Sequence, residues 1–162
     1  MIGFLKNPRA VEYLELVAAD KVTKINDTTR SRIKTIITRG TEKGWSYDKM
    51  AREISSRFEE FAVGKPQQHI DSRAHLVAVT ETAEAYEEGN RIAAKQIQQQ
   101  GITMEKFWLT VKDNRVSDGC DENMDAGWIG IDEAFPSGHQ RPPRFPGCRC
   151  DTLYRRKPQE GE

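Results

Sequence analysis

The chain has few of the residues on which most active sites depend. It contains three histidines and three cysteines among 162 residues. It lacks a nucleophile elbow, a glycine-rich phosphate loop and the H-E-x-x-H pattern of zinc peptidases. Because no set of side chains with a recognisable catalytic spacing assembles, the sequence does not predict an enzyme.

Long hydrophobic runs are also missing. No apolar segment reaches the roughly 20 residues that a helix needs to cross a bilayer, and the stretch Met1–Lys6 is too short for the apolar region of a signal peptide. Apolar residues make up 36% of the chain and charged residues 31%, which is typical of a soluble protein with a modest core. We therefore expect no membrane partner and reduced thiols in a cytosolic compartment.

The chain as a whole has no excess of positive or negative charge, but two of its segments do. The 25 basic and 25 acidic residues balance, so the molecule as a whole does not resemble a nucleic-acid binder. Residues 113–133 hold seven acids and one base, whereas residues 141–157 hold six bases and one acid. Either these two segments fold together and neutralise each other, or the basic segment is an arm that binds nucleic acid or an acidic protein surface.

The residues before Gly101 predict helices, and those after it predict strands and turns. Ser46 is a candidate N-cap, and Gly40 and Gly101 are candidate helix ends. Residues 113–147 are rich in turn-forming pairs. The spaced acids from Asp121 to Asp125 lie in this segment and favour a polar turn. The expected elements are helices over 24–39, from 46 onward and over 67–99, and strands over 107–112 and 148–155.

This order predicts an α+β fold, in which a helical N-terminal part and a long central helix pack on a small, turn-rich C-terminal unit that contains β-structure. We expect an N-terminal helical region over 1–64, a core over 65–157 and a disordered tail over 158–162.

The three cysteines form the only candidate metal site. Cys120 lies in the acidic segment, and Cys148 and Cys150 are separated by one residue after a proline-rich stretch. Thiolates are good zinc ligands, and His139 is a candidate fourth ligand. Shared ligation by Cys148 and Cys150 needs a bend in the chain, which Pro146-Gly147 can provide. The alternative is that the three thiols are small apolar side chains of a buried core.

Glu81 lies inside the predicted long helix, between Thr80 and Thr82. It is either an ordinary exposed helical residue or a buried anchor for an arginine. The candidate arginines are Arg73, Arg115 and Arg149.

Several short motifs follow one another along the chain in an informative order. They are Thr-Glu-Thr at 80–82, the strand-like Phe107–Thr110, Asp113–Val116 with a cysteine shortly after, and a Pro-Pro turn before Cys-Arg-Cys at 148–150. This order resembles the phage Mu F-like minor head protein family, the head morphogenesis family of tailed phages, over roughly residues 20–155. The chain departs from the family pattern at Val79 (usually Arg), Ser117 (often Cys) and Phe145 (usually His).

The resemblance implies a structural role rather than catalysis. It implies a minor capsid protein of a phage or prophage that binds the portal and other head proteins during assembly in the bacterial cytoplasm. In the virion it would lie in the capsid interior, where packaged DNA is a further partner. The site residues that it implies are a polar core of Glu81, Asp113, Arg115 and Arg149, and a structural zinc site at Cys120, Cys148 and Cys150. His139 stays the candidate fourth ligand because of its place in the intervening loop.

Two other functions fit parts of the sequence. The basic segment from Arg141 to Lys157 suits a nucleic-acid-binding module. The three cysteines suit a metal-dependent enzyme, such as a nuclease.

Overall fold

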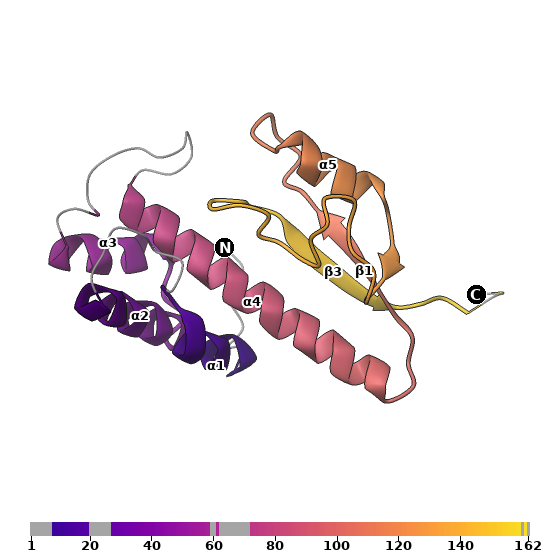
Figure 1. Cartoon of the computed structure of the whole chain (residues 1–162), viewed down its shortest axis with the longest axis horizontal. Coiled ribbons are helices and arrows are strands. Elements are labelled where there is room, and N and C mark those ends of the chain that lie inside the picture. The colour runs from indigo at the N-terminus through magenta and orange to yellow at the C-terminus, as the bar shows by residue number, and fades with distance from the viewer. Residues whose placement is uncertain (1–7, 20–26, 59–60, 62–71, 160, 162) are drawn as a thin grey trace. The chain divides into compact units, whose positions relative to one another are not determined.

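The computed structural model describes residues 8–19, 27–58, 61, 72–159 and 161. The expected domain boundary between residues 64 and 65 and part of the expected disordered tail lie outside these residues, and both stay predictions. The helices are α1 (Pro8–Val17), α2 (Asp27–Glu42), α3 (Tyr47–Arg57), α4 (Arg73–Gln99) and α5 (Asp118–Asp125), and the strands are β1 (Met104–Leu109), β2 (Ile129–Gly130) and β3 (Asp151–Arg156) (Figure 1).

These helices and a three-stranded antiparallel sheet confirm the α+β class. The chain divides into two compact units, Met1–Gly89 and Asn90–Glu162, and the boundary falls within α4. Within the described part of the chain, every helix is too short or too polar to pass through a lipid bilayer.

The first unit is held together by apolar faces of its helices. Isoleucines from one stripe of α2 pack with residues of α1, α3 and the first half of α4, which buries them from water. The buried residues of this core are Ala10, Leu14, Ala18, Ala19, Ile33, Ile36, Ile37, Ala51, Ile54, Phe58, Phe61, Ala74, Val77 and Ala85.

The prediction that Gly40 ends the second helix is wrong. Helix α2 runs through Gly40, where a Cβ would lie only 2.7 Å from the Met50 Cγ. The glycine therefore permits close packing of α2 on α3. The helix ends at Glu42 and is closed by Gly44, which has a φ of +65°, with hydrogen bonds from Gly44 N to Thr41 O and from Trp45 N to Gly40 O. This pair of bonds is a Schellman motif.

Two predicted helix signals are confirmed. Ser46 caps α3 by accepting a hydrogen bond from the Lys49 N–H at 3.2 Å. Gly101, with a φ of +92°, follows the end of α4 at Gln99. Residues 67–71 of the predicted long helix lie outside the described residues.

The second unit is built on the sheet β2-β1-β3, with β1 in the centre. Residues of β1 alternate between buried and half-exposed, so its buried side chains all point to one face of the sheet. The strand begins and ends three residues earlier than predicted. Beyond its end, Lys112 takes a left-handed φ of 56°, which an extended strand does not tolerate.

The segment predicted to be a polar turn contains a helix instead. Helix α5 lies beside the sheet and contacts β1 (Figure 1). Its first turn carries Asp118 and Asp121, which favour a helix N-terminus because of the helix dipole. Asn123 is fully buried, and its side chain bonds the hydroxyl and the backbone N–H of Ser137 at 2.8 and 2.9 Å. These tertiary contacts fix the helix where local turn propensity alone favoured a loop.

Candidate metal centre

The three cysteines come from two elements of the second unit. Cys120 lies in the first turn of α5, whereas Cys148 and Cys150 lie just before β3. The chain turns at Phe145–Cys148, where the Cys148 N–H donates to the Phe145 carbonyl at 3.0 Å and Gly147 has a φ of 82°. Proline followed by a positive-φ glycine is typical of a type II turn, which is the bend that the sequence predicted at Pro146-Gly147.

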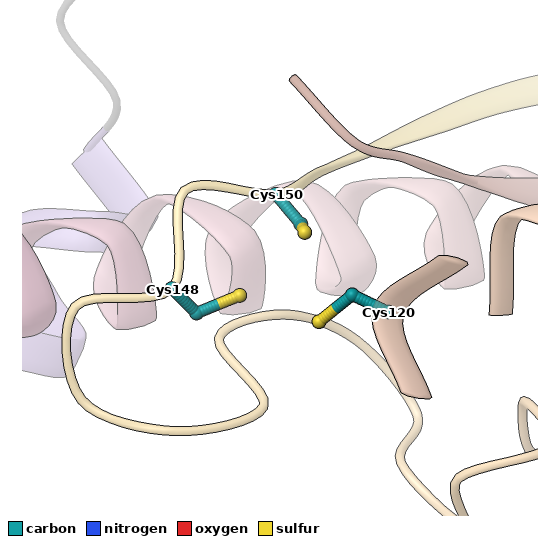
Figure 2. Close-up of side chains that lie close together, drawn as sticks. All are labelled: Cys120, Cys148 and Cys150. Carbon is teal, nitrogen blue, oxygen red and sulfur yellow. The ribbon is translucent and has the colours of Figure 1, made fainter. Parts of the chain in front are cut away.

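The three side chains converge, with their sulfur atoms directed toward one another (Figure 2). All three Sγ atoms lie within 4.8 Å of one another, and all three thiols are free and buried. Four thiolates about 2.3 Å from a tetrahedral zinc ion would lie roughly 3.8 Å apart. The cluster therefore needs only a small contraction to hold such an ion.

The pKa values of the three thiols are shifted in different directions. Hydrogen bonding from the Cys150 thiol, with help from backbone N–H groups, lowers the pKa of Cys148 to about 6, although burial opposes this shift. The hydrogen bond with Cys148 and burial raise the pKa of Cys150, and burial raises the pKa of Cys120. Cys148 is therefore the thiol of the group that loses its proton most readily, and a bound cation would favour loss of the others.

Two side chains around the sulfurs suit a thiolate site. The buried indole N–H of Trp108 meets no hydrogen-bond partner at normal distance among the described residues, yet it lies close enough to lower the pKa of Cys150. Burial raises the pKa of Cys120, and the nearby Ser117 hydroxyl partly opposes this rise. Such donors orient metal-bound thiolates. Ser117 is also the N-cap residue of α5, and its hydroxyl accepts from Arg144 Nη1 at 3.2 Å.

His139 is not brought to the sulfurs. Its Nδ1 lies 3.0 Å from the Ser137 hydroxyl and 3.1 Å from the Ser137 carbonyl. Within the described ranges, the group of potential ligands contains the three cysteines and no fourth histidine, cysteine or acid. The fourth position of a tetrahedral ion would fall to water or to a partner's side chain.

Asp113 and Arg149, two members of the predicted polar core, form an ion pair. Arg149 donates two hydrogen bonds of 2.8 Å to the two oxygens of Asp113. This pairing, together with the backbone N–H of Arg115, lowers the pKa of Asp113 to about 2. The pair links the loop after β1 to the residue between Cys148 and Cys150, so it supports the position of both cysteines.

Glu81 is buried, so its interpretation as an exposed helical residue is wrong. Its carboxylate accepts a hydrogen bond of 3.1 Å from the backbone N–H of Ala19, which follows α1 with a φ of 64°. Glu81 therefore anchors the end of α1 within the first unit. Its membership of one polar core with Asp113, Arg115 and Arg149 stays a prediction.

The basic segment is partly neutralised within the second unit. Arg149 pairs with Asp113, as expected if the acidic and basic segments meet, whereas Arg155 pairs with Glu105 on β1 at 3.0 Å. The Arg155 guanidinium also lies 4.0 Å from the centre of the Trp128 ring. At least two of the six bases are therefore engaged by carboxylates of the same unit.

The sequence analysis did not predict that Trp108 and Lys106 are buried in the core of the second unit. Both are fully buried on the core face of β1. Their positions, two residues apart in an alternating strand, were the available signal. A lysine within such a stripe is normally assigned to the solvent side, and only the register of the sheet places it inside.

The chain matches the model of the family described as phage Mu protein F like protein over residues 31–153. The chain belongs to this family. The match includes all three cysteines, Ser117 and the Asp113–Arg149 pair. No curated protein and no solved structure matches the chain significantly. Family membership identifies a phage head morphogenesis protein with a structural role.

Proposed function

We propose that this protein is a minor capsid component that binds the portal and other head proteins while the phage head assembles in the bacterial cytoplasm, and that it stays inside the capsid. The family match over residues 31–153 is the observation that carries this proposal. Structural head proteins act through their surfaces, so the exposed apolar side chains of the fold are the first places to test.

The helices of the first unit offer one such surface. Leu16 on α1 is 70% exposed, the largest fraction among the large apolar side chains that the structure describes. Such a side chain gains from burial in a protein partner, at about 1.5–3 kcal/mol for full burial. We assign the portal-binding surface to this helical unit.

Co-expression with the cognate portal protein tests the role. We expect the two proteins to co-purify, and Leu16→Glu to weaken the association. Ile97→Glu is the matched control, because Ile97 is an exposed apolar residue on a helix of the second unit, at 40% exposure. Failure of the folded wild-type proteins to associate would refute portal binding, and equal effects of the two variants would refute the assignment to the first unit.

We also propose that Cys120, Cys148 and Cys150 hold a structural zinc ion. The convergence of three buried sulfurs within 4.8 Å supports this, as does the lowered pKa of Cys148, which favours the thiolate form that binds metals. A small unit with one short sheet gains much from such a link, about 2.7 kcal/mol when free zinc exceeds its dissociation constant a hundredfold.

Elemental analysis of protein purified without chelator tests the zinc site. We expect one zinc ion per chain, and a chelator that lowers the thermal midpoint of the wild type without lowering that of Cys148→Ser. Protein with intact thiols and no bound metal would show instead that the cysteines act only as core residues.

The two alternative functions gain less support. A phosphate-binding arm needs free cations, and Arg149 and Arg155 are both engaged by carboxylates. A salt-dependent DNA-binding titration tests whether packaged DNA is a partner. A metal-dependent nuclease needs acid–base groups beside the metal, whereas Trp108 and Phe135 are buried in the same core as the cysteines.

A further inference from the structure

One face of the sheet in the second unit carries apolar side chains that the core does not use. The opposite face buries Met104 and Trp108. Because strand residues alternate between faces, this outer face presents Phe107 and Leu109 from β1, which are half-exposed, and Leu153 from β3, which is 42% exposed. Solvated sheet faces normally carry polar side chains at these positions.

An aromatic row crosses the centre of this face. Phe107 pairs with Leu153 on β3, and the Phe107 and Trp128 rings lie 5.4 Å apart at the β2 side. Phenylalanine, tryptophan and leucine in one patch are typical of the centre of a protein interface.

Charges of opposite sign lie on either side of this row, toward the two ends of β3. At one end, Arg155 is 41% exposed and covers Glu105, which is 13% exposed, so that end presents a guanidinium. Lys157 continues the same side of the strand and is exposed. At the other end, Asp151 is exposed and pairs with Leu109. The patch is therefore apolar in the middle, positive at one end and negative at the other.

Such a patch is complementary to itself. When the two faces stack, a two-fold axis that lies between them, along the row and perpendicular to the strands, places the central row of one copy on the same row of its partner. This axis brings Arg155 opposite the partner's Asp151. An axis parallel to the strands would instead bring like charges together. We propose that the outer sheet face, defined by Phe107, Leu109, Trp128, Leu153 and Arg155, joins two copies of this chain in an antiparallel, two-fold dimer.

The observations favour a second copy over a nucleic acid. Arg155 lies on the Trp128 ring, at 4.0 Å, where a base would stack. The exposed carboxylate of Asp151 would repel a phosphate at the other end of the patch. The dimer rests on this face alone, so it does not depend on portal binding or on a metal.

Sedimentation equilibrium of the full chain over roughly 1 µM to 1 mM, the range that suits a small interface, tests the dimer. We expect a concentration-dependent dimer, and Leu153→Glu to raise its dissociation constant at least tenfold. Ile102→Glu is the matched control, because Ile102 is 40% exposed and lies outside the strands. A wild type that stays monomeric, or a dimer that Leu153→Glu leaves unchanged, would overturn the proposal.

Mild oxidation of a cysteine variant tests the orientation independently. In the antiparallel arrangement Leu153 lies near the two-fold axis, so Leu153→Cys should form a disulfide-linked dimer, whereas Ile102→Cys should not. Equal cross-linking of both variants would indicate random collision and contradict the antiparallel dimer. Circular dichroism of each variant establishes that it is folded.

Discussion

Lys106 provides the sharpest test of the second unit, because it is a fully buried lysine. Its Nζ donates hydrogen bonds of 3.0 and 2.8 Å to the carbonyl and the side-chain oxygen of Gln140, and it lies 5.0 Å from the centre of the Phe135 ring. These acceptors are neutral. Burial, together with nearby Arg91, lowers the pKa of Lys106 from 10.5 to about 8, although Asp132 opposes the shift.

The shift sets the direction of a pH effect. Between pH 8 and 10.5 the unfolded chain holds the Lys106 proton and the folded chain has lost it, so the free energy of unfolding rises with pH through this window. Each pKa unit corresponds to about 1.4 kcal/mol. After allowance for relaxation around the ammonium group, we expect a rise of roughly 2 kcal/mol that belongs to this one side chain.

Substitution Lys106→Met removes the titrating group and keeps the volume of the side chain. Urea unfolding at a series of pH values from 7 to 10.5, followed by tryptophan fluorescence, gives the free energy of unfolding for each protein. The wild type should gain about 2 kcal/mol relative to the variant across the window. Lys112→Met, at an exposed position beyond β1, is the control for loss of a lysine. Equal pH slopes for the wild type and Lys106→Met would refute the reasoning.

Three further substitutions follow from the structure. Gly40→Ala should lower the free energy of unfolding by about 1 kcal/mol, because its Cβ would lie 2.7 Å from Met50 Cγ and this strain exceeds the gain in helix propensity; an unchanged urea midpoint would contradict the packing. Ser117→Cys should bind zinc at least about tenfold more tightly, because it supplies a fourth sulfur beside Cys120, and competition with a chromophoric chelator measures the difference. Asp113→Asn should abolish the stability that the carboxylate contributes above pH 3.8 and loses as pH falls through about 2; thermal midpoints from pH 2 to 5 that fall in parallel for variant and wild type would argue against the pair with Arg149.

Local signals in the sequence were reliable where one residue type has one physical use. Ser46 caps α3 because its hydroxyl satisfies a free backbone N–H. Gly101 ends α4 because its φ of +92° is costly for any residue with a Cβ. Gly40 gave a wrong prediction because glycine has two uses in helices: it can end a helix, or it can permit close packing of a neighbouring helix. Only the contact with Met50 shows that the second use applies here.

The candidate site was predicted in composition but not in geometry. The sequence predicted the three cysteines as a site and the bend at Pro146-Gly147, whereas it predicted a turn where the structure has α5. Its aspartates and Asn123 have weak helix propensity, so burial of Asn123 against Ser137 decides the local structure. Without α5, the distance from Cys120 to the other two sulfurs has no definite value.

The sequence alone determined the α+β class, the family and the residues from which a thiol site can be made, because these depend on periodicity, on residue type and on the order of short motifs. Tertiary structure alone decided that the three sulfurs meet within 4.8 Å, that Glu81 is buried against Ala19 and that Lys106 lies inside. Each of these depends on contacts between residues more than ten positions apart, and such contacts are set by packing and strand register rather than by local propensity.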